Sequence, residues 1–108
     1  MIINEDRLKK ALTYLAETDI PAANAKGLSE GLSEQRKSIK AILMLDSNKK
    51  TAVDREADAY AHENYREHIS RMENAIADYE TYRNKRKTEE LIVEVWRTEQ
   101  ANRRKGNI

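Results

Sequence analysis

The sequence contains no cysteine and no phenylalanine, and it has only one proline and three glycines in 108 residues. The absence of cysteine excludes a disulfide framework, a thiolate nucleophile and a cysteine-based metal site. So few turn-forming residues argue against a sheet, whose strands need tight turns between them. No apolar run approaches the length that spans a bilayer, and the first residues lack the apolar core of a signal peptide. We therefore expect a soluble, intracellular chain.

Charged residues, by contrast, are abundant. They make up 36% of the chain against 39% apolar residues, and the mean hydropathy is −0.90. This balance is typical of long helices with wide solvated faces, folded as one domain over residues 1–108. The charges are segregated: residues 51–82 carry three Lys/Arg against eight Asp/Glu, and residues 83–108 carry eight against four. Such asymmetry indicates where partners dock.

Two helices are predicted in the first half of the chain. Asn4 before an acidic first turn predicts the start of a short helix over residues 4–17. Pro21 then favours a break and a restart, because its missing N–H is tolerated only in a first turn. The second helix is expected over residues 20–46, followed by a polar turn.

The third predicted helix is long, over residues 51–104, with Thr51 as its N-cap. Its apolar and aromatic residues follow a strict four-three spacing, which places them on one stripe of a helix like a coiled-coil seam. A break at 84–88 is the alternative, but the seam keeps its phase and favours a continuous helix. The seam comprises Tyr65, His68, Met72, Ala75, Tyr79, Tyr82, Arg86, Glu89, Val93 and Trp96.

The short turn after residue 46 predicts an antiparallel helical hairpin, with the first helix laid against it. Gly27 and Gly31 lie four residues apart on one face, and with Leu28 and Leu32 beside them they favour close approach of the first helix over the alternative of tolerated surface glycines. In this arrangement the residues beyond Tyr79 extend past their partner as a C-terminal arm. The expected hairpin core is Leu12, Leu28, Leu32, Ile39, Ile42, Met72 and Ile76.

An unpartnered arm with apolar side chains predicts self-association, since burying each such side chain is worth about 1.5–3 kcal/mol. We expect an antiparallel homodimer, alone or within a larger homo-oligomer, whose arms cross near residues 86–89. Arg86 of one copy would then lie beside Glu89 of the other. The predicted interface is Tyr79, Tyr82, Arg86, Glu89, Ile92, Val93 and Trp96.

No catalytic constellation is present in the sequence. The two histidines, His62 and His68, are six residues apart and fall on different helix faces, so neither a zinc-protease motif nor a Glu-x-x-His di-iron motif exists. His68 lies on the seam and is expected to be a core histidine bonded to a neighbour. We predict a protein that is not an enzyme and that needs no metal or cofactor.

The basic clusters favour contact with nucleic acid, because Lys and Arg neutralise phosphates whatever the base sequence. The alternative is a solvated helix surface and tail, offset by nearby glutamates. Trp96 could stack on bases, but its place on the seam favours an interface anchor. The candidate nucleic-acid contacts are Arg83, Lys85, Arg86, Lys87, Arg97, Arg103, Arg104 and Lys105.

The run ETYRNKRKTEELIVEVWRTEQANRRKGNI, with the thirty residues before it, resembles small helical proteins encoded by tailed phages and prophages. The resemblance covers roughly residues 12–108, and its most specific part is the ending from Trp96 onward. It implies a phage origin, a bacterial cytoplasm and genes near replication and recombination functions. It brings no catalytic residues.

Two functions are therefore expected from the sequence. The first is a non-catalytic phage accessory to DNA replication or recombination that touches nucleic acid through its basic C-terminal segments. The second is a protein-only adaptor or inhibitor that binds a host enzyme, or a defence or nuclease complex, through the acidic stretch 54–80.

Overall fold

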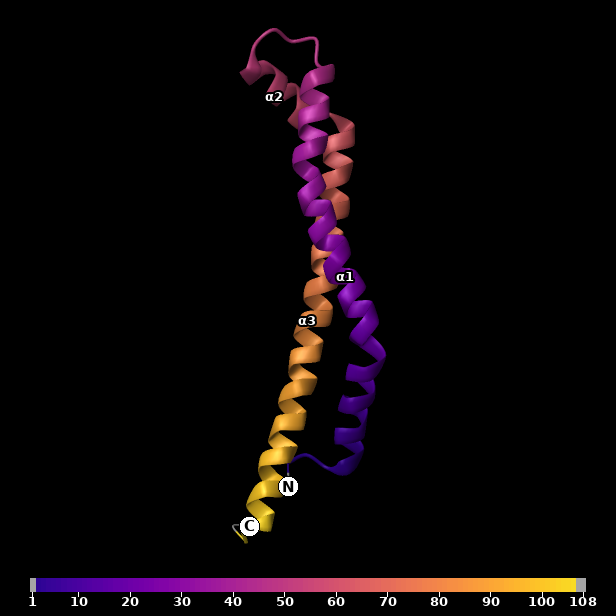
Figure 1. Cartoon of the computed structure of the whole chain (residues 1–108), viewed down its shortest axis with the longest axis vertical. Helices are drawn as coiled ribbons and strands as arrows, with labels where there is room; N and C mark the ends of the chain where they lie inside the picture. Colours follow the sequence, from indigo (N-terminus) through magenta and orange to yellow (C-terminus); the bar gives the residue numbers. More distant parts are fainter. Residues whose placement is uncertain (1, 107–108) are drawn as a thin grey trace. The chain divides into compact units, whose positions relative to one another are not determined.

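The computed structural model describes residues 2–106 and contains three α-helices, α1 (Glu5–Asp46), α2 (Ala52–Ala61) and α3 (Glu63–Arg104) (Figure 1). No strand occurs in this described part, and the prediction of an all-α fold is confirmed. The chain forms two compact units. Unit 1 combines the residues up to Ala23 with those from Glu80 onward, and unit 2 is Asn24–Tyr79.

Helix α1 is a single helix, so the predicted break between residues 17 and 20 is wrong. Asn4 caps it as expected, accepting a hydrogen bond of 2.8 Å from the backbone N–H of Arg7. Pro21 lies inside and removes one backbone hydrogen bond. The helix continues because a stripe of covered residues keeps its four-three phase past the proline. These residues are Leu8, Ala11, Leu15, Thr18, Ala22, Ala25, Ser29 and Leu32.

The helix predicted over residues 51–104 is in fact two helices, and the break lies at His62, where no proline or glycine marks it. His62 has an extended backbone (φ −68°, ψ 139°), and its Nδ1 accepts a hydrogen bond of 3.0 Å from the N–H of Asn64. The imidazole thereby caps the first turn of α3. Thr51 caps α2 as predicted, at 3.1 Å from the N–H of Asp54. Helix α3 runs without interruption through residues 84–88.

Unit 2 holds six of the seven buried residues in the described part of the chain. Leu32 is 5% exposed and His68 is 4% exposed. The two meet directly, since Nε2 of His68 lies 2.6 Å from the carbonyl oxygen of Leu32. A carbonyl only accepts, so Nε2 carries the proton and donates. The prediction that His68 is a core histidine bonded to a neighbour is confirmed.

The predicted hairpin core is partly wrong. Leu32 is buried and Ile39 and Met72 are half-buried, but the other four members are exposed: Leu12 50%, Leu28 56%, Ile42 56% and Ile76 39%. On α1 the covered stripe includes alanine, serine and threonine as well as leucine. Leu12 and Leu28, which belonged to the expected core, lie beside this stripe and are exposed.

The glycines of α1 do not mark a close approach. A Cβ added at Gly27 or at Gly31 would meet nothing within 4 Å. The expectation of a helix packed there is therefore wrong, because the residues before Pro21 continue the same helix instead of folding back along it.

In unit 1 the start of α1 runs antiparallel to the end of α3. The N–H of Ile2 donates to Oε1 of Glu99 at 3.0 Å, and Arg7 binds Glu89 further along. Residue numbers rise on α1 as they fall on α3. Residues beyond Tyr79 therefore have a partner within the chain, and the expected unpartnered arm is wrong.

We predict that His68→Ala lowers the free energy of unfolding by about 2–4 kcal/mol, because it removes a buried ring and a buried hydrogen bond. Urea denaturation followed by circular dichroism measures this. Ser70→Ala, an exposed change on the same helix, is the control and should cost less than about 0.5 kcal/mol. Equal losses in the two variants would contradict the assignment of His68 to the core.

Candidate functional site

Arg86, predicted to bind nucleic acid and to form a dimer contact, instead points onto α1. Its Nη1 donates to the carbonyl oxygen of Leu15 at 2.8 Å and to Oγ1 of Thr18 at 2.6 Å. Its Nη2 lies 3.6 Å from Oδ1 of Asp19, and the side chain is only 20% exposed. These contacts occupy the guanidinium, so we no longer count Arg86 among the candidate phosphate contacts.

Glu89, the second charge of the seam, is also paired within the chain. Nη2 of Arg7 lies 2.9 Å and 2.7 Å from the two carboxylate oxygens of Glu89, which is 18% exposed. Arg86 and Glu89 therefore both have partners on α1. The electrostatic argument for placing a two-fold axis between them no longer applies.

The remaining residues of the predicted dimer interface are half-buried within the chain itself: Tyr79, Tyr82, Ile92, Val93 and Trp96. The apolar side chains that α3 leaves exposed in unit 1 are others, Leu91 at 59% and Val95 at 39%. If a second copy of the chain binds to α3 in unit 1, the apolar residues exposed to it are Leu91 and Val95, which lie beside the predicted seam.

The other predicted nucleic-acid contacts are exposed: Arg83, Lys85, Lys87, Arg97, Arg103, Arg104 and Lys105. Arg83 pairs with Glu80 at 3.2 Å and Arg97 with Glu94 at 3.1 Å, each one turn apart on α3. Exposed pairs of this kind contribute only about 0.2–0.5 kcal/mol. A phosphate can therefore compete for these two guanidinium groups.

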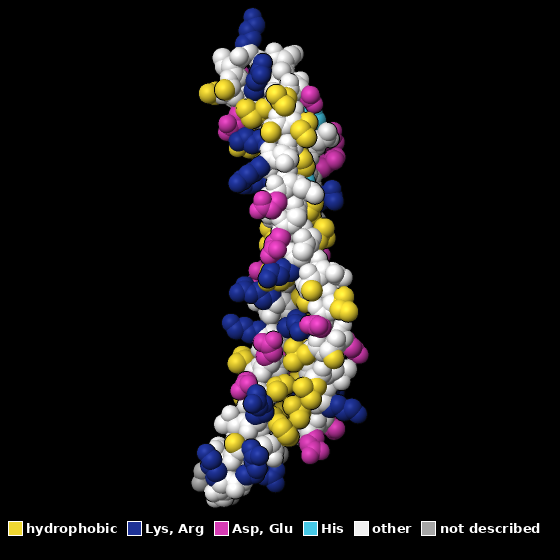
Figure 2. Space-filling model, viewed as in Figure 1, with side chains coloured by type: hydrophobic (Ala, Val, Ile, Leu, Met, Phe, Trp, Pro, Cys, Tyr) yellow, Lys and Arg dark blue, Asp and Glu magenta, His cyan; other side chains and the backbone are white. Residues whose placement is uncertain are grey.

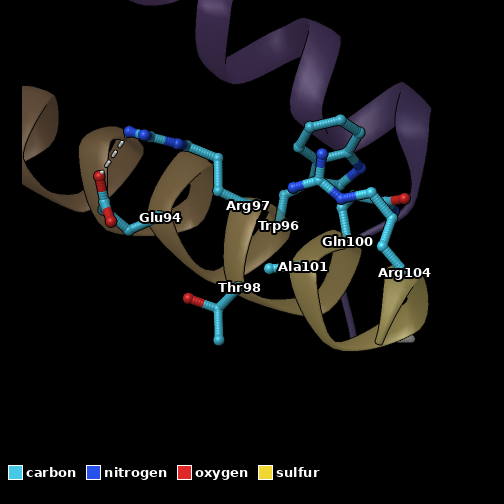
Figure 3. A pocket seen from close by; sticks show the side chains of 7 residues that line it. All are labelled: Glu94, Trp96, Arg97, Thr98, Gln100, Ala101 and Arg104. Carbon is cyan, nitrogen blue, oxygen red and sulfur yellow. Dashed lines mark hydrogen bonds and ion pairs between the residues drawn. The ribbon is translucent and has the colours of Figure 1, made fainter. Parts of the chain in front are cut away.

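A cavity of about 540 Å³ lies along the last turns of α3 (Figure 3), and its lining includes Trp96 with two of the predicted nucleic-acid contacts, Arg97 and Arg104. In the close-up the side chain of Arg104 extends back along the helix toward Trp96. The lining residues are Glu94, Trp96, Arg97, Thr98, Gln100, Ala101 and Arg104.

Trp96 is half-buried, and its Nε1 is covered from solvent yet has no hydrogen-bond partner among the described residues. The same holds for Oε2 of Glu99, whose other oxygen accepts from Ile2. A buried polar atom without a partner costs about 1–3 kcal/mol. An acceptor can reach the indole N–H only if the side chains that cover it move.

The chemistry of this cavity is that of a binding site with an aromatic ring, two guanidinium groups and an unpaired donor. Arginine binds phosphate through a planar fork of donors, and indole rings stack on nucleobases. Within residues 2–106, no group of three or more His, Asp or Glu side chains is placed to hold a metal ion.

Comparisons with protein-family models, curated proteins and solved structures find no match for this chain. None of the helices over the described residues has the length and apolar character required to cross a membrane.

We predict that Arg86→Ala destabilises the protein by about 1.5–3 kcal/mol, since it removes charge-assisted hydrogen bonds to a covered backbone carbonyl. Because the contacts are intramolecular, the loss should not change with protein concentration. Urea denaturation at two concentrations checks this, with Lys85→Ala, an exposed neighbour, as the control. A loss that appears only at high concentration would place the Arg86 contact between chains.

Proposed function

We propose that this chain is a non-catalytic helical binding protein that contacts single-stranded nucleic acid at the basic end of α3. The observation that carries the proposal is the cavity in which Trp96 lies with Arg97 and Arg104. An aromatic ring with cations nearby is the combination that single-strand binding proteins use, with the ring stacking on a base and the cations holding phosphates.

The charge of the surrounding segment supports the same function. Residues 83–108 carry eight Lys/Arg against four Asp/Glu. Glu89 is already paired with Arg7, so it offsets little of the exposed positive charge. Phosphate contacts made by such a segment release bound counterions, and binding should weaken steeply as salt rises.

The resemblance to helical proteins of tailed phages gives this binding a context. We propose that the chain acts beside enzymes of phage DNA replication or recombination in the bacterial cytoplasm, where single strands are exposed. Its role there would be to hold a strand rather than to cut or join it.

We predict that Arg104→Ala/Lys105→Ala weakens binding to oligothymidine about tenfold or more at low salt. Each lost phosphate contact should also reduce the slope of log K against log salt by about 0.7. Fluorescence anisotropy of a labelled oligonucleotide measures both quantities.

The matched control is Lys9→Ala/Lys10→Ala, which removes the same charge from exposed positions on α1 in the same unit. It should change the affinity less than about twofold. No binding by the wild-type protein at low salt, or equal losses in the two double variants, would contradict the proposal.

A second candidate function, self-association, is favoured by a groove in unit 1. The groove has a volume of about 420 Å³ and its lining is mostly apolar, with Leu12 50% exposed and Leu91 59% exposed. Figure 2 shows hydrophobic side chains gathered over this part of unit 1, between the start of α1 and the end of α3. The lining residues are Leu12, Leu15, Lys87, Glu90, Leu91, Val93 and Glu94.

The rim charges of this groove suit a second copy of the chain. Lys87 and Glu94 lie seven residues apart on the same side of α3, with Leu91 between them. An antiparallel copy of α3 centred between residues 90 and 91 would place Lys87 of each chain beside Glu94 of the other. We therefore propose a homodimer in which these residues replace Arg86 and Glu89 as the complementary pair.

We predict that Glu94→Lys weakens this dimer about tenfold, because it sets like charges against each other, and that adding Lys87→Glu restores it. Leu91→Ser should weaken it as well, while Val53→Ser, a still more exposed apolar position outside the groove, should not. Sedimentation equilibrium at about 10–100 µM measures the association. A wild-type monomer throughout that range would exclude the dimer.

A further inference from the structure

A further cavity, of about 420 Å³, lies in unit 2, and no pattern in the sequence indicated it. It lies between the C-terminal part of α1 and the junction of α2 with α3, so its lining comes entirely from unit 2. Its volume falls within the range of small-molecule sites. The lining residues are Arg36, Lys37, Lys40, Ala41, Met44, Tyr60 and Tyr65.

Three cations of α1 line one side of this cavity, Arg36 and the adjacent Lys37, and Lys40 about one turn further on. Lys40 is held in place, with its Nζ 3.5 Å from Oε1 of Glu56 and 4.7 Å from the centre of the Tyr60 ring. Arg36 and Lys37 are exposed, and neither forms an ion pair with any residue that the structure describes. The two unpaired cations are available to an anionic ligand.

Two tyrosines line the other side. The ring centres of Tyr60 and Tyr65 are 5.3 Å apart with an interplanar angle of 70°, an edge-to-face contact. Tyr65 is 9% exposed and anchors the pair, whereas Tyr60 is 44% exposed. Tyr60 therefore presents part of a braced aromatic ring to the cavity.

The break at His62 makes this aromatic pair. Residues five apart on a continuous α-helix point about 140° away from each other, so Tyr60 and Tyr65 would lie on different faces of one helix. The extended backbone of His62 changes the direction of the chain between them and lets the two rings meet. The break between α2 and α3 thus positions the two tyrosines that form one wall of the cavity.

The charge of Lys40 is secured by its surroundings. A side-chain hydrogen bond to Tyr60 raises the pKa of Lys40, and the charge of Glu56 raises it further, against the opposing effect of desolvation. The ammonium group beside Tyr60 therefore remains positive throughout the neutral range.

We propose that this cavity binds one nucleotide unit, with its phosphate held by Arg36 and Lys37 and its base against the ring of Tyr60. The planar ring beside cations favours a ligand that has both a flat aromatic part and an anionic group. An acidic peptide supplies the charge without the flat ring. The site lies in a different unit from the end of α3 and goes beyond the contact proposed there.

A free nucleotide and a single strand share this chemistry, and the test uses a probe for each. Thymidine monophosphate and inorganic phosphate are titrated separately while amide chemical shifts are followed by NMR. Oligothymidine containing 4-thiothymidine is photocrosslinked, and the attached residue is identified by mass spectrometry. We expect thymidine monophosphate to shift the amides around Lys37 and Tyr60 more than phosphate does, and the crosslink to map to Tyr60.

Two variants test the roles of the ring and the cations. Tyr60→Leu keeps an apolar side chain but removes the stacking surface, and should weaken binding about fivefold or more. Arg36→Gln/Lys37→Gln should weaken binding about tenfold and lower the salt slope. Arg66→Gln/Arg71→Gln, which removes two exposed cations of unit 2 outside the cavity, is the matched control. Circular dichroism establishes that each variant remains helical.

The outcomes separate this site from the end of α3. If Tyr60→Leu and Arg36→Gln/Lys37→Gln leave every probe unaffected while Arg104→Ala/Lys105→Ala abolishes oligothymidine binding, the cavity is not a nucleotide site. Equal shifts with phosphate and with thymidine monophosphate would also overturn it, because the ring would then contribute nothing.

Loss of binding confined to the cavity variants would instead support this site and contradict the proposed contact on α3. Shifts by thymidine monophosphate without any oligothymidine binding would support a site for free nucleotides.

Discussion

The bond between Arg86 and the turn of α1 before Pro21 is the interaction on which the arrangement of unit 1 depends. Proline removes a backbone donor and weakens the helix at this point. The guanidinium binds the carbonyl of Leu15 and the hydroxyl of Thr18, and that hydroxyl donates to the carbonyl of Tyr14. A charged side chain of α3 thus binds α1 within the turn before the proline, and it sets which residues of the two helices face each other.

The core of the protein is thin for a chain of this length, which makes such polar contacts important. In unit 1 only Ala11 is buried among the described residues, and the buried set of unit 2 includes Ser29 and His68. Small side chains on the inner stripe of α1 bring little apolar area to the packing, so hydrogen bonds and ion pairs determine the register. Several large apolar side chains remain on the outer faces, where partners can bind.

Both proposed binding sites combine an aromatic ring with cations, but they are built differently. Around Trp96 the cations Arg97 and Arg104 come from the same helix as the ring, about two turns apart on α3. Around Tyr60 the cations come from α1, and the ring is positioned by the break between α2 and α3. Each site lies within one unit, so each can bind whatever the relation between the units.

The sequence by itself determined the all-α fold, the cap at Thr51 and the seam of α3, because capping and large side chains at four-three spacing are local signals. It also identified His68 as buried, since a histidine on that stripe must face the interior. Only the tertiary structure decided that α1 continues past Pro21, because the covered stripe around the proline consists of Thr18, Ala22, Ala25 and Ser29, which hydrophobicity does not distinguish from a surface. The burial of Arg86 was likewise decided there, since its partners on α1 lie far away in the sequence. The break at His62 also appears only in the structure, because no proline or glycine marks it.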